Sequence, residues 1–199
     1  MHSDYVDNYV IGIDEAGRGP LAGPVSVGLV KVREGFDLPA TFPGLHDSKK
    51  LSEKKREALF SILEEEVKKG TVEYLVLLIS ANDIDEKGIA VCIREAVVSG
   101  LAQLFPNPTE GKVWLDGSLH ATKEYTQETV IGGDGIVPAI MLASVAAKVV
   151  RDRVMVAYGV QYPAYGFASH KGYGTKMHIA ALKEHGLSDI HRKTFIHID

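Results

Sequence analysis

The sequence predicts an α/β domain, built on a mixed β-sheet whose faces are covered by helices. Short runs rich in β-branched residues alternate with longer stretches in which apolar residues recur at helical spacing. Three of the predicted strands lead into acidic residues, and two of these are followed directly by glycine. No linker divides the chain, so we expect a single domain over residues 1–199, with about 160–199 as a small C-terminal helical appendage.

The first half of the chain contains three predicted strands and one long helix. A tight, glycine-rich connection joins the first two strands, which favours an antiparallel pair. Ser52 is a good N-cap for the helix, and Gly70 is a suitable residue to end it. The predicted strands cover 9–14, 25–32 and 72–79, the helix covers 53–69, and a loop covers 33–46.

The second half alternates helices with short strands. Asn82, Asp83 or Asp85 can cap the first of these helices. Pro138 is a favoured first-turn residue, so it marks the start of the longest helix. The predicted helices cover 86–104, 138–158 and 176–185, the strands cover 112–115 and 128–131, and an aromatic, glycine-rich loop covers 159–175.

Composition excludes some classes of protein and leaves others open. The single cysteine, Cys92, rules out an internal disulfide and fits a reducing compartment. No apolar run reaches the roughly 18 residues of a membrane span, and no signal peptide is recognisable, so we expect a cytoplasmic protein. The net charge of −4 does not point to a nucleic-acid partner. Carboxylates that bind cations would nevertheless lower that number without opposing such a partner.

The acidic strand ends are the strongest chemical signal. If the strands are neighbours, Asp14, Glu15, Asp116 and Asp134 converge at one edge of the sheet. Carboxylate oxygens are preferred by Mg²⁺ and similar hard cations, and two such ions can activate water against a phosphodiester. An aspartate before glycine is often only a turn residue, which leaves that alternative open for Asp116 and Asp134. Adjacent acids after a buried strand repel each other, so the first pair is harder to explain without a cation.

Several sequence blocks carry a specific resemblance. Taken in order along nearly the whole chain, they resemble type 2 ribonuclease H, the ribonuclease HII family. The blocks are Asp14–Pro24 (DEAGRGPLAGP), Asp47–Ser52 (DSKKLS), Leu115–Gly117 (LDG), Gly133–Asp134 (GD), Ala143–Asp152 (ASVAAKVVRD), Tyr165–Phe167 (YGF), His170–Thr175 (HKGYGT) and His191–Arg192 (HR).

The resemblance implies an RNase H-like fold and a Mg²⁺- or Mn²⁺-dependent endonuclease with two ions per site. It implies cleavage of the RNA strand of RNA–DNA hybrids and incision 5′ to single ribonucleotides in duplex DNA, as in ribonucleotide excision repair, leaving 3′-hydroxyl and 5′-phosphate ends. The four acids would be the metal ligands. Backbone groups of Gly17, Arg18 and Gly19 would contact the ribose 2′-hydroxyl, with Arg18 near phosphate, and Tyr173 would pack on sugar at the RNA–DNA junction.

Other polar residues have competing interpretations. Lys49 precedes a helix N-terminus, a natural phosphate site, although a solvated turn is the simpler reading. Lys148 shares a helix face with Ser144 and is a candidate phosphate contact. Asp152 competes with Asp134 for the fourth ligand position, but flanking arginines favour an ion pair for it.

Two other functions are compatible with such a fold. One is a DNA-acting nuclease such as a junction resolvase, against which the glycine–arginine–glycine segment and Tyr173 argue. The other is a hybrid-binding module without catalysis, against which the four acids argue. We expect a monomer with RNA–DNA hybrid and ribonucleotide-containing duplex DNA as its partners, and no membrane.

Overall fold

The computed structural model describes residues 8–46, 48 and 50–197, and within them five strands form one mixed sheet. The sheet order is β3-β2-β1-β4-β5. β1 pairs antiparallel with β2, as predicted, and parallel with β4. The strands are β1 (Tyr9–Ala16), β2 (Val25–Arg33), β3 (Val72–Ile79), β4 (Gly111–Asp116) and β5 (Thr126–Val130).

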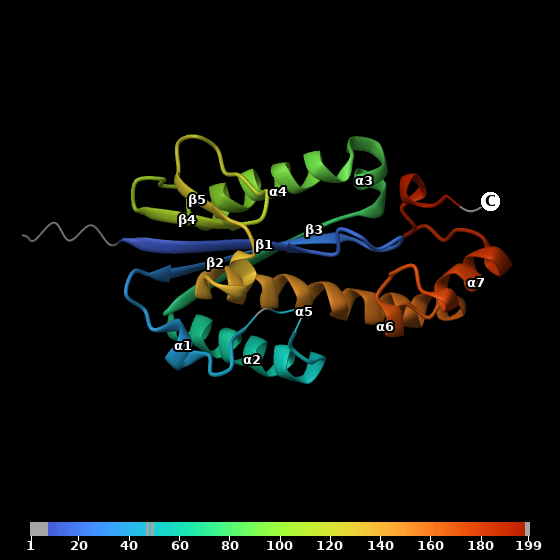
Figure 1. The fold of residues 1–199 in the computed structure, drawn as a ribbon, viewed down its shortest axis with the longest axis horizontal. Coiled ribbons are helices and arrows are strands. Elements are labelled where there is room, and N and C mark those ends of the chain that lie inside the picture. The colour runs from blue at the N-terminus through green and yellow to red at the C-terminus, as the bar shows by residue number, and fades with distance from the viewer. Residues whose placement is uncertain (1–7, 47, 49, 198–199) are drawn as a thin grey trace, which may run out of the picture.

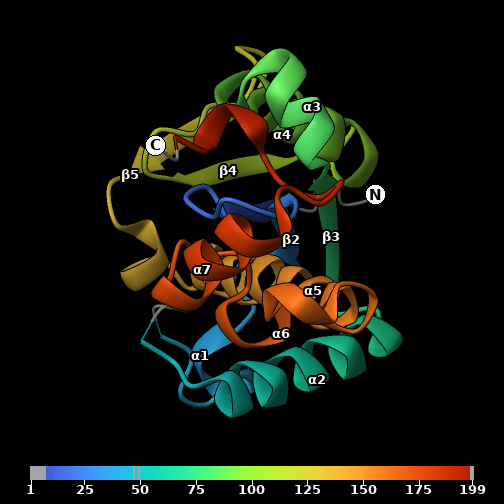
Figure 2. The same ribbon diagram turned by 90° about the vertical axis from the view of Figure 1, so that its right-hand side faces the viewer.

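Helices cover both faces of the sheet, which confirms the predicted α/β class. α5 lies across one face with α2 outside it, and α3 and α4 cover the other face (Figures 1 and 2). No helix in these described ranges is both long and apolar enough to cross a membrane. The α-helices are α1 (Leu38–Thr41), α2 (Glu53–Lys69), α3 (Ala81–Lys87), α4 (Ile89–Leu104), α5 (Pro138–Gln161), α6 (Phe167–His170) and α7 (Lys176–His185), and the 3₁₀ turns are η1 (Gly133–Gly135), η2 (Pro163–Tyr165) and η3 (Lys193–Phe195).

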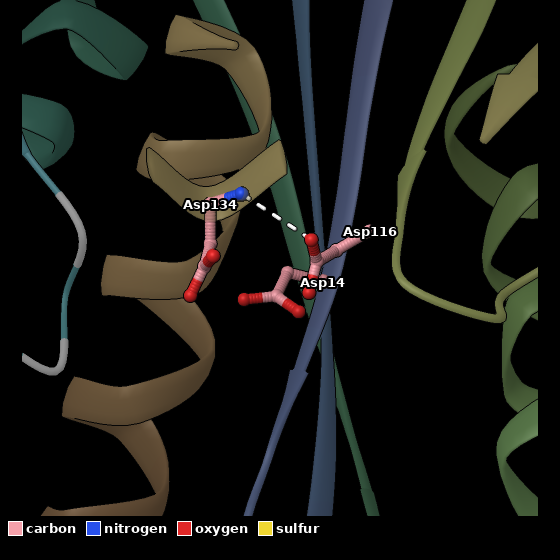
Figure 3. A group of neighbouring side chains, drawn as sticks. All are labelled: Asp14, Asp116 and Asp134. Atoms are coloured by element: carbon pink, nitrogen blue, oxygen red, sulfur yellow. Dashed lines mark hydrogen bonds between the residues drawn. The ribbon is translucent and has the colours of Figure 1, made fainter. Parts of the chain in front are cut away.

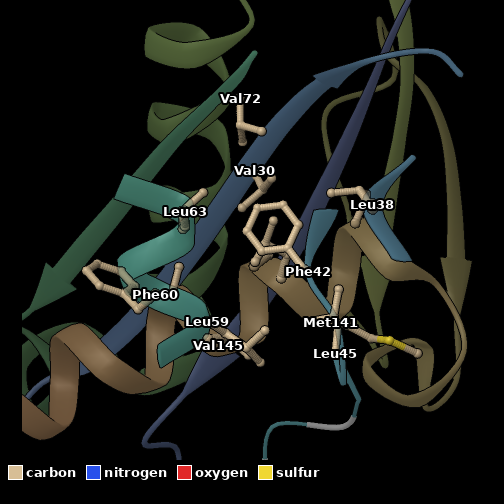
Figure 4. Packing of buried hydrophobic residues seen from close by; sticks show 14 of the residues in the cluster. Val30, Leu38, Phe42, Leu45, Leu59, Phe60, Leu63, Val72, Met141 and Val145 are labelled. Carbon is tan, nitrogen blue, oxygen red and sulfur yellow. The ribbon is translucent and has the colours of Figure 1, made fainter. Parts of the chain in front are cut away.

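α5 lies directly on the central strands. A Cβ atom at Gly12 of β1 would come within 2.1 Å of the backbone of Ala139, so only glycine permits this approach. The buried cluster around Val30, Phe42 and Leu142 fills the space between the sheet, α5 and α2 (Figure 4). Burying each such side chain contributes about 1.5–3 kcal/mol. The position of α5 relative to β1 is therefore closely constrained, which matters because both elements carry site residues.

The helix over Glu53–Lys69 has the bounds that the sequence predicts. The Ser52 hydroxyl accepts a hydrogen bond from the Lys55 amide, and Gly70 ends the helix in the left-handed conformation. Leu59, Phe60 and Leu63 are buried against the core. Local signals decide both ends of this helix, so its bounds can be predicted from the sequence alone.

The predicted helix over 86–104 is wrong in its bounds and its cap. Two helices, α3 and α4, occupy the segment, and Gly88 separates them with φ of 81°. The cap of α3 is Ser80, whose hydroxyl accepts from the Asp83 amide. The glycine interrupts the apolar periodicity too briefly to be noticed in sequence. The loops expected over 33–46 and 159–175 likewise contain α1 and α6.

The C-terminal segment packs against the connection between β1 and β2. Ala22 and His191 form an isolated antiparallel bridge, and the Leu21 amide donates to the Gly172 carbonyl. Met155, Phe167 and Leu182 belong to a separate small core. Figure 2 shows α6 and α7 at this end of the molecule. The segment thus contacts the glycine-rich connection that follows the first acidic pair.

Candidate active site

Three aspartates meet at the carboxyl ends of β1 and β4. Asp14 and Asp116 each follow the registered pair Ile13–Leu115 of these parallel strands, so they lie side by side. Asp134 comes from η1, and its amide donates to Oδ1 of Asp116 at 3.3 Å. One carboxylate oxygen from each of the three lies within 4.8 Å of the others. Figure 3 shows the three carboxylates facing a common space.

Glu15 faces the same pocket but stands apart from this trio. Successive side chains of a strand point to opposite faces, so Glu15 cannot simply continue the direction of Asp14. Its Oε1 pairs with Nη1 of Arg18 at 3.1 Å, and its Oε2 is buried without a hydrogen-bond partner. Both acids line one pocket of about 210 Å³, which we call the acidic pocket. Its walls are formed by Asp14, Glu15, Ala16, Gly17, Arg18, Gly19, Ser48, Asp116, Ser144, Lys148 and Tyr173.

The environment of Asp14 disfavours its negative charge. Burial raises the pKa of Asp14 well above its usual value, and the charges of Glu15 and Asp116 raise it further, while a hydrogen bond from Ser144 opposes the shift. The side chain is 2% exposed, and its Oδ2 has no hydrogen-bond partner. A positive charge placed close to this carboxylate would favour its ionised form.

A divalent cation fits these residues. The trio offers three oxygens close enough for one ion, and two buried carboxylate oxygens, on Asp14 and Glu15, have no hydrogen-bond partner. An all-oxygen donor set suits Mg²⁺ or Mn²⁺ and leaves coordination positions for water and phosphate. The Arg18 guanidinium alone does not supply the missing charge, because it contacts Glu15 rather than the buried oxygens.

Two buried arginines hold the connection from Gly17 to Pro24, which we call the GRG loop. Arg192 donates to the carbonyls of Gly17, Arg18 and Gly23 at 2.7, 2.9 and 2.9 Å. Arg151 donates from Nε to Pro24 O at 2.8 Å. Both side chains are fully buried. Burial lowers the pKa of Arg192 to about 10, so it remains charged at neutral pH.

Gly17 is required by this packing. Its φ is +88°, and a Cβ atom there would lie 2.0 Å from Nε of Arg151. Gly19 differs, because a Cβ atom there would meet nothing within 4 Å. Gly17 therefore serves the fold of the loop, whereas Gly19 leaves backbone open to an approaching ligand.

Polar residues of α5 and the chain before α2 form another wall of the acidic pocket. The hydroxyls of Ser48 and Ser144 lie 2.7 Å apart. Nζ of Lys148 donates to Oδ1 of Asp152 at 2.7 Å, and Oδ2 of Asp152 lies 3.7 Å from Nη2 of Arg56. Burial lowers the pKa of Lys148, and Asp152 opposes that shift. Asp152 is thus an ion-pair partner of Lys148 and Arg56, and Nη1 of the flanking Arg151 lies 3.9 Å from its Oδ1.

Tyr173 closes the pocket from the C-terminal segment and is 43% exposed. Its carbonyl accepts from Nδ1 of His178 at 2.9 Å, and Nε2 of His178 lies 3.0 Å from Nε2 of His191. The Ser188 amide donates to Nδ1 of His191 at 2.8 Å. This set of donors requires both imidazoles to be neutral, with the shared proton on His191. Burial lowers the pKa of His191 to about 4.

The structure brings the predicted site residues together. Every predicted site residue that the structure describes lies in the acidic pocket or in the aspartate trio. Lys49 lies outside the described residues, as does Asp47. Arg192 was recognised only as part of a sequence block, and its contacts to the GRG loop were missed. Arg192 donates to backbone carbonyls that are distant in sequence, and no local sequence pattern reveals such contacts.

The sequence is similar to those of known proteins along nearly its whole length. The family model described as Ribonuclease HII matches residues 11–198. The chain is 44% identical over 189 residues to the ribonuclease HII of Ruminiclostridium cellulolyticum, covering 95% of this chain and 70% of that protein. It is 45% identical over 186 residues to the ribonuclease HII of Endomicrobium trichonymphae, covering 94% and 84%.

The fold is similar to the folds of several solved structures. The crystal structure of ribonuclease H2 from Pyrococcus horikoshii superposes with a TM-score of 0.75 at 27% identity, covering 94% of this chain and 93% of that one. The ribonuclease HII of Archaeoglobus fulgidus, solved in complex with PCNA, gives 0.75 at 24% identity, covering 96% of both chains. A ribonuclease HIII solved with Mn²⁺ gives 0.66 at 16% identity, covering 94% of this chain and 67% of that one.

Proposed function

Since the chain belongs to the ribonuclease HII family, whose members are metal-dependent endonucleases acting on RNA–DNA hybrids, we propose that it also incises duplex DNA on the 5′ side of single embedded ribonucleotides. The observation that carries the proposal is the sharing of one pocket by the carboxylates, the GRG loop and Tyr173. The 2′-hydroxyl distinguishes RNA from DNA, so a group that reads it must approach closely. In this pocket that group would lie beside the acids.

The proposed roles follow from the contacts. Asp14, Glu15, Asp116 and Asp134 would hold divalent cations, two during catalysis, and Mg²⁺ or Mn²⁺ suits their oxygens. When bound, such ions supply an activated water and offset the charge that develops on the departing 3′-oxygen, which leaves 3′-hydroxyl and 5′-phosphate ends. The acids come from β1, β4 and the η1 turn, which packs on α5, so the fold itself brings them together.

The GRG loop would orient the ribose. The open backbone at Gly19 allows close approach of the 2′-hydroxyl, with Gly17 and Arg18 beside it. The Tyr173 ring would pack on the sugar on the opposite wall. Lys148, whose Nζ lies 6.0 Å from the centre of that ring, would contact a backbone phosphate. Lys49 is proposed as a second phosphate contact on the basis of its sequence position alone.

The cellular setting is also a proposal. We expect a cytoplasmic monomer that acts on chromosomal DNA, which the lone buried Cys92 and the substrate class support. The partners would be RNA–DNA hybrid and ribonucleotide-containing duplex DNA.

A nicking assay tests the proposal. Two labelled duplexes, identical except for one ribonucleotide, are incubated with Mg²⁺ or Mn²⁺. We expect a single cut 5′ to the ribonucleotide and none in the all-DNA duplex. Cutting of both duplexes alike would support a DNA-acting nuclease instead, and binding without cutting would support a non-catalytic module. In the same assay Asp14→Asn should abolish cleavage while largely preserving duplex binding.

A further inference from the structure

A second pocket adjoins the acidic pocket on the α4 side of the sheet. It has a volume of about 210 Å³, and we call it the α4 pocket. Buried Ile93, Val97 and Leu119 form its floor. Its polar walls come from three separate segments, the GRG loop, α4 and the turn after β4, and consist of Arg18, Arg94, Ser118 and His120. Arg18 lines both pockets, so the two sites share a wall.

The positive charge of the α4 pocket is only partly compensated. None of its lining residues is acidic. Within the described part of the chain, Arg94 makes no hydrogen bond or ion pair, and Arg18 pairs only with Glu15. His120 approaches Thr129 through Nδ1 at 3.4 Å, which leaves Nε2 directed elsewhere. An arginine that is exposed and unpaired beside an apolar floor is available for an anion.

We propose that the α4 pocket binds a non-scissile backbone phosphate of the nucleic-acid substrate. Arg94 and Arg18 would hold the phosphate oxygens, Ser118 and His120 would add hydrogen bonds, and the attached sugar would pack on the apolar floor. The inference rests on the proposed function, because the shared Arg18 places the phosphate on the same duplex that enters the acidic pocket. Guanidinium groups match phosphate geometry and carry no base preference, so this contact fixes the position of the duplex.

Salt dependence of binding provides the first test. Equilibrium binding of the ribonucleotide-containing duplex is measured in EDTA at several salt concentrations for the wild type, Arg94→Ala and Arg94→Lys. Loss of one phosphate contact makes the negative slope of log K against log salt shallower by about 0.9 and weakens binding roughly tenfold. We expect this for Arg94→Ala, with most of the binding retained in Arg94→Lys. Unchanged affinity and slope in Arg94→Ala would overturn the proposal.

A phosphate scan identifies the contact itself. Neutral methylphosphonates replace single phosphates along each strand, and binding is compared between the wild type and Arg94→Ala. At one or two positions the replacement should weaken the wild type but cause no further loss in the variant. Losses that add at every position would reject the pocket as a duplex contact. Saturation by inorganic phosphate, detected as an Arg94-dependent chemical shift change but without such a position, would likewise reject it in favour of a free-anion site.

Control measurements distinguish an effect on stability from effects on cleavage and on phosphate binding. Arg33→Ala is the control substitution. Arg33 is also exposed, but it lies opposite Tyr9 in the register of β1 and β2, at the end of β1 away from Asp14. Its replacement should leave binding unchanged. Arg94 lies exposed on α4, so its variants should keep the wild-type Tm. Both binding tests are independent of cleavage. If the nicking assay fails but the methylphosphonate scan still finds an Arg94-dependent position, only the proposed incision is rejected. If nicking is observed but the scan finds no such position, only the proposed role of the α4 pocket is rejected.

Discussion

Nη2 of Arg192 donates to the carbonyl oxygen of Gly17 across 175 residues of sequence, at 2.7 Å. The guanidinium makes two further donations to the GRG loop and has no exposed surface. A loop proposed to contact the ribose is thus shaped by a cation that is distant in sequence. The first prediction follows from this relationship.

Arg192→Lys should destabilise the protein and impair the GRG loop together. Lysine presents one nitrogen in place of the three that contact the Gly17, Arg18 and Gly23 carbonyls, so it cannot reproduce this geometry. We expect a loss of about 2–4 kcal/mol in the free energy of unfolding, together with a rise in KM for the single-ribonucleotide duplex. Denaturant titration and steady-state kinetics measure the two effects. Arg153→Lys alters an exposed pair with Glu57 and should cost less than about 1 kcal/mol.

Gly17→Ala and Gly19→Ala should differ in kind. At Gly17 the positive φ and the contact with Arg151 make any side chain strained, so both Tm and activity should fall. At Gly19 there is open space, so Tm should stay within about 2 °C while ribonucleotide-dependent cleavage falls at least tenfold. Thermal denaturation and the nicking assay distinguish the two. Equal effects of both substitutions on Tm would contradict the assigned roles.

Asp14→Asn should stabilise the metal-free protein at pH 7.5. The pKa of Asp14 is raised in the folded state, so its contribution to stability falls as pH rises from the ordinary value of 3.8 through the folded value. At pH 7.5 the metal-free wild type must either keep a buried negative charge on Asp14 or bind a proton there, and asparagine avoids both costs. Scanning calorimetry in EDTA should show the higher Tm in the variant.

Divalent cation should reverse that order. At a hundredfold excess over its dissociation constant, Mg²⁺ stabilises the folded state by about 2.7 kcal/mol, which raises Tm by roughly 5–10 °C. We expect this rise for the wild type and a much smaller one for Asp14→Asn. An equal rise in both proteins would mean that the ion binds elsewhere.

Acid should destabilise the protein through the pair of His178 and His191. The folded pKa of His191 is about 4, below its ordinary 6.5, so between these values the unfolded chain takes up a proton that the folded chain excludes. The free energy of unfolding should therefore fall by up to about 3 kcal/mol as pH drops through this range. Denaturant titrations at successive pH values should show a shallower dependence for His191→Asn. His185→Asn changes an exposed imidazole and should leave the dependence as in the wild type.

Sequence reasoning reached most elements because their signals are local. Ser52 and Gly70 mark the two ends of α2 by themselves, and the acids stand at strand ends, which their position in the chain already reveals. The two-helix break at Gly88 was missed, because one residue with positive φ scarcely alters apolar spacing. Lys148 was placed on the correct face, but its partner Asp152 became clear only from the structure.

The separation of Glu15 from the aspartate trio was missed because the predicted strand ended at residue 14, whereas β1 continues to Ala16. Adjacent acids look equivalent in a chain, whereas strand geometry sends them in different directions. The contacts of Arg192 and Arg151 with the GRG loop depend on tertiary packing over more than a hundred residues. No periodicity, cap or turn rule carries information about such pairs.

The dependence of the GRG loop on Arg192 has a consequence for biosynthesis. Ribosomes release the N-terminal part of a domain first, and long-range contacts wait for their later partner. All three clustered aspartates have been translated by residue 134, but the loop beside them lacks its clamp until residue 192 has emerged. The aspartates proposed to bind the cation are therefore made well before the loop proposed to contact the ribose can take its final shape. Translation order thus delays the shaping of this loop until residue 192 has been made.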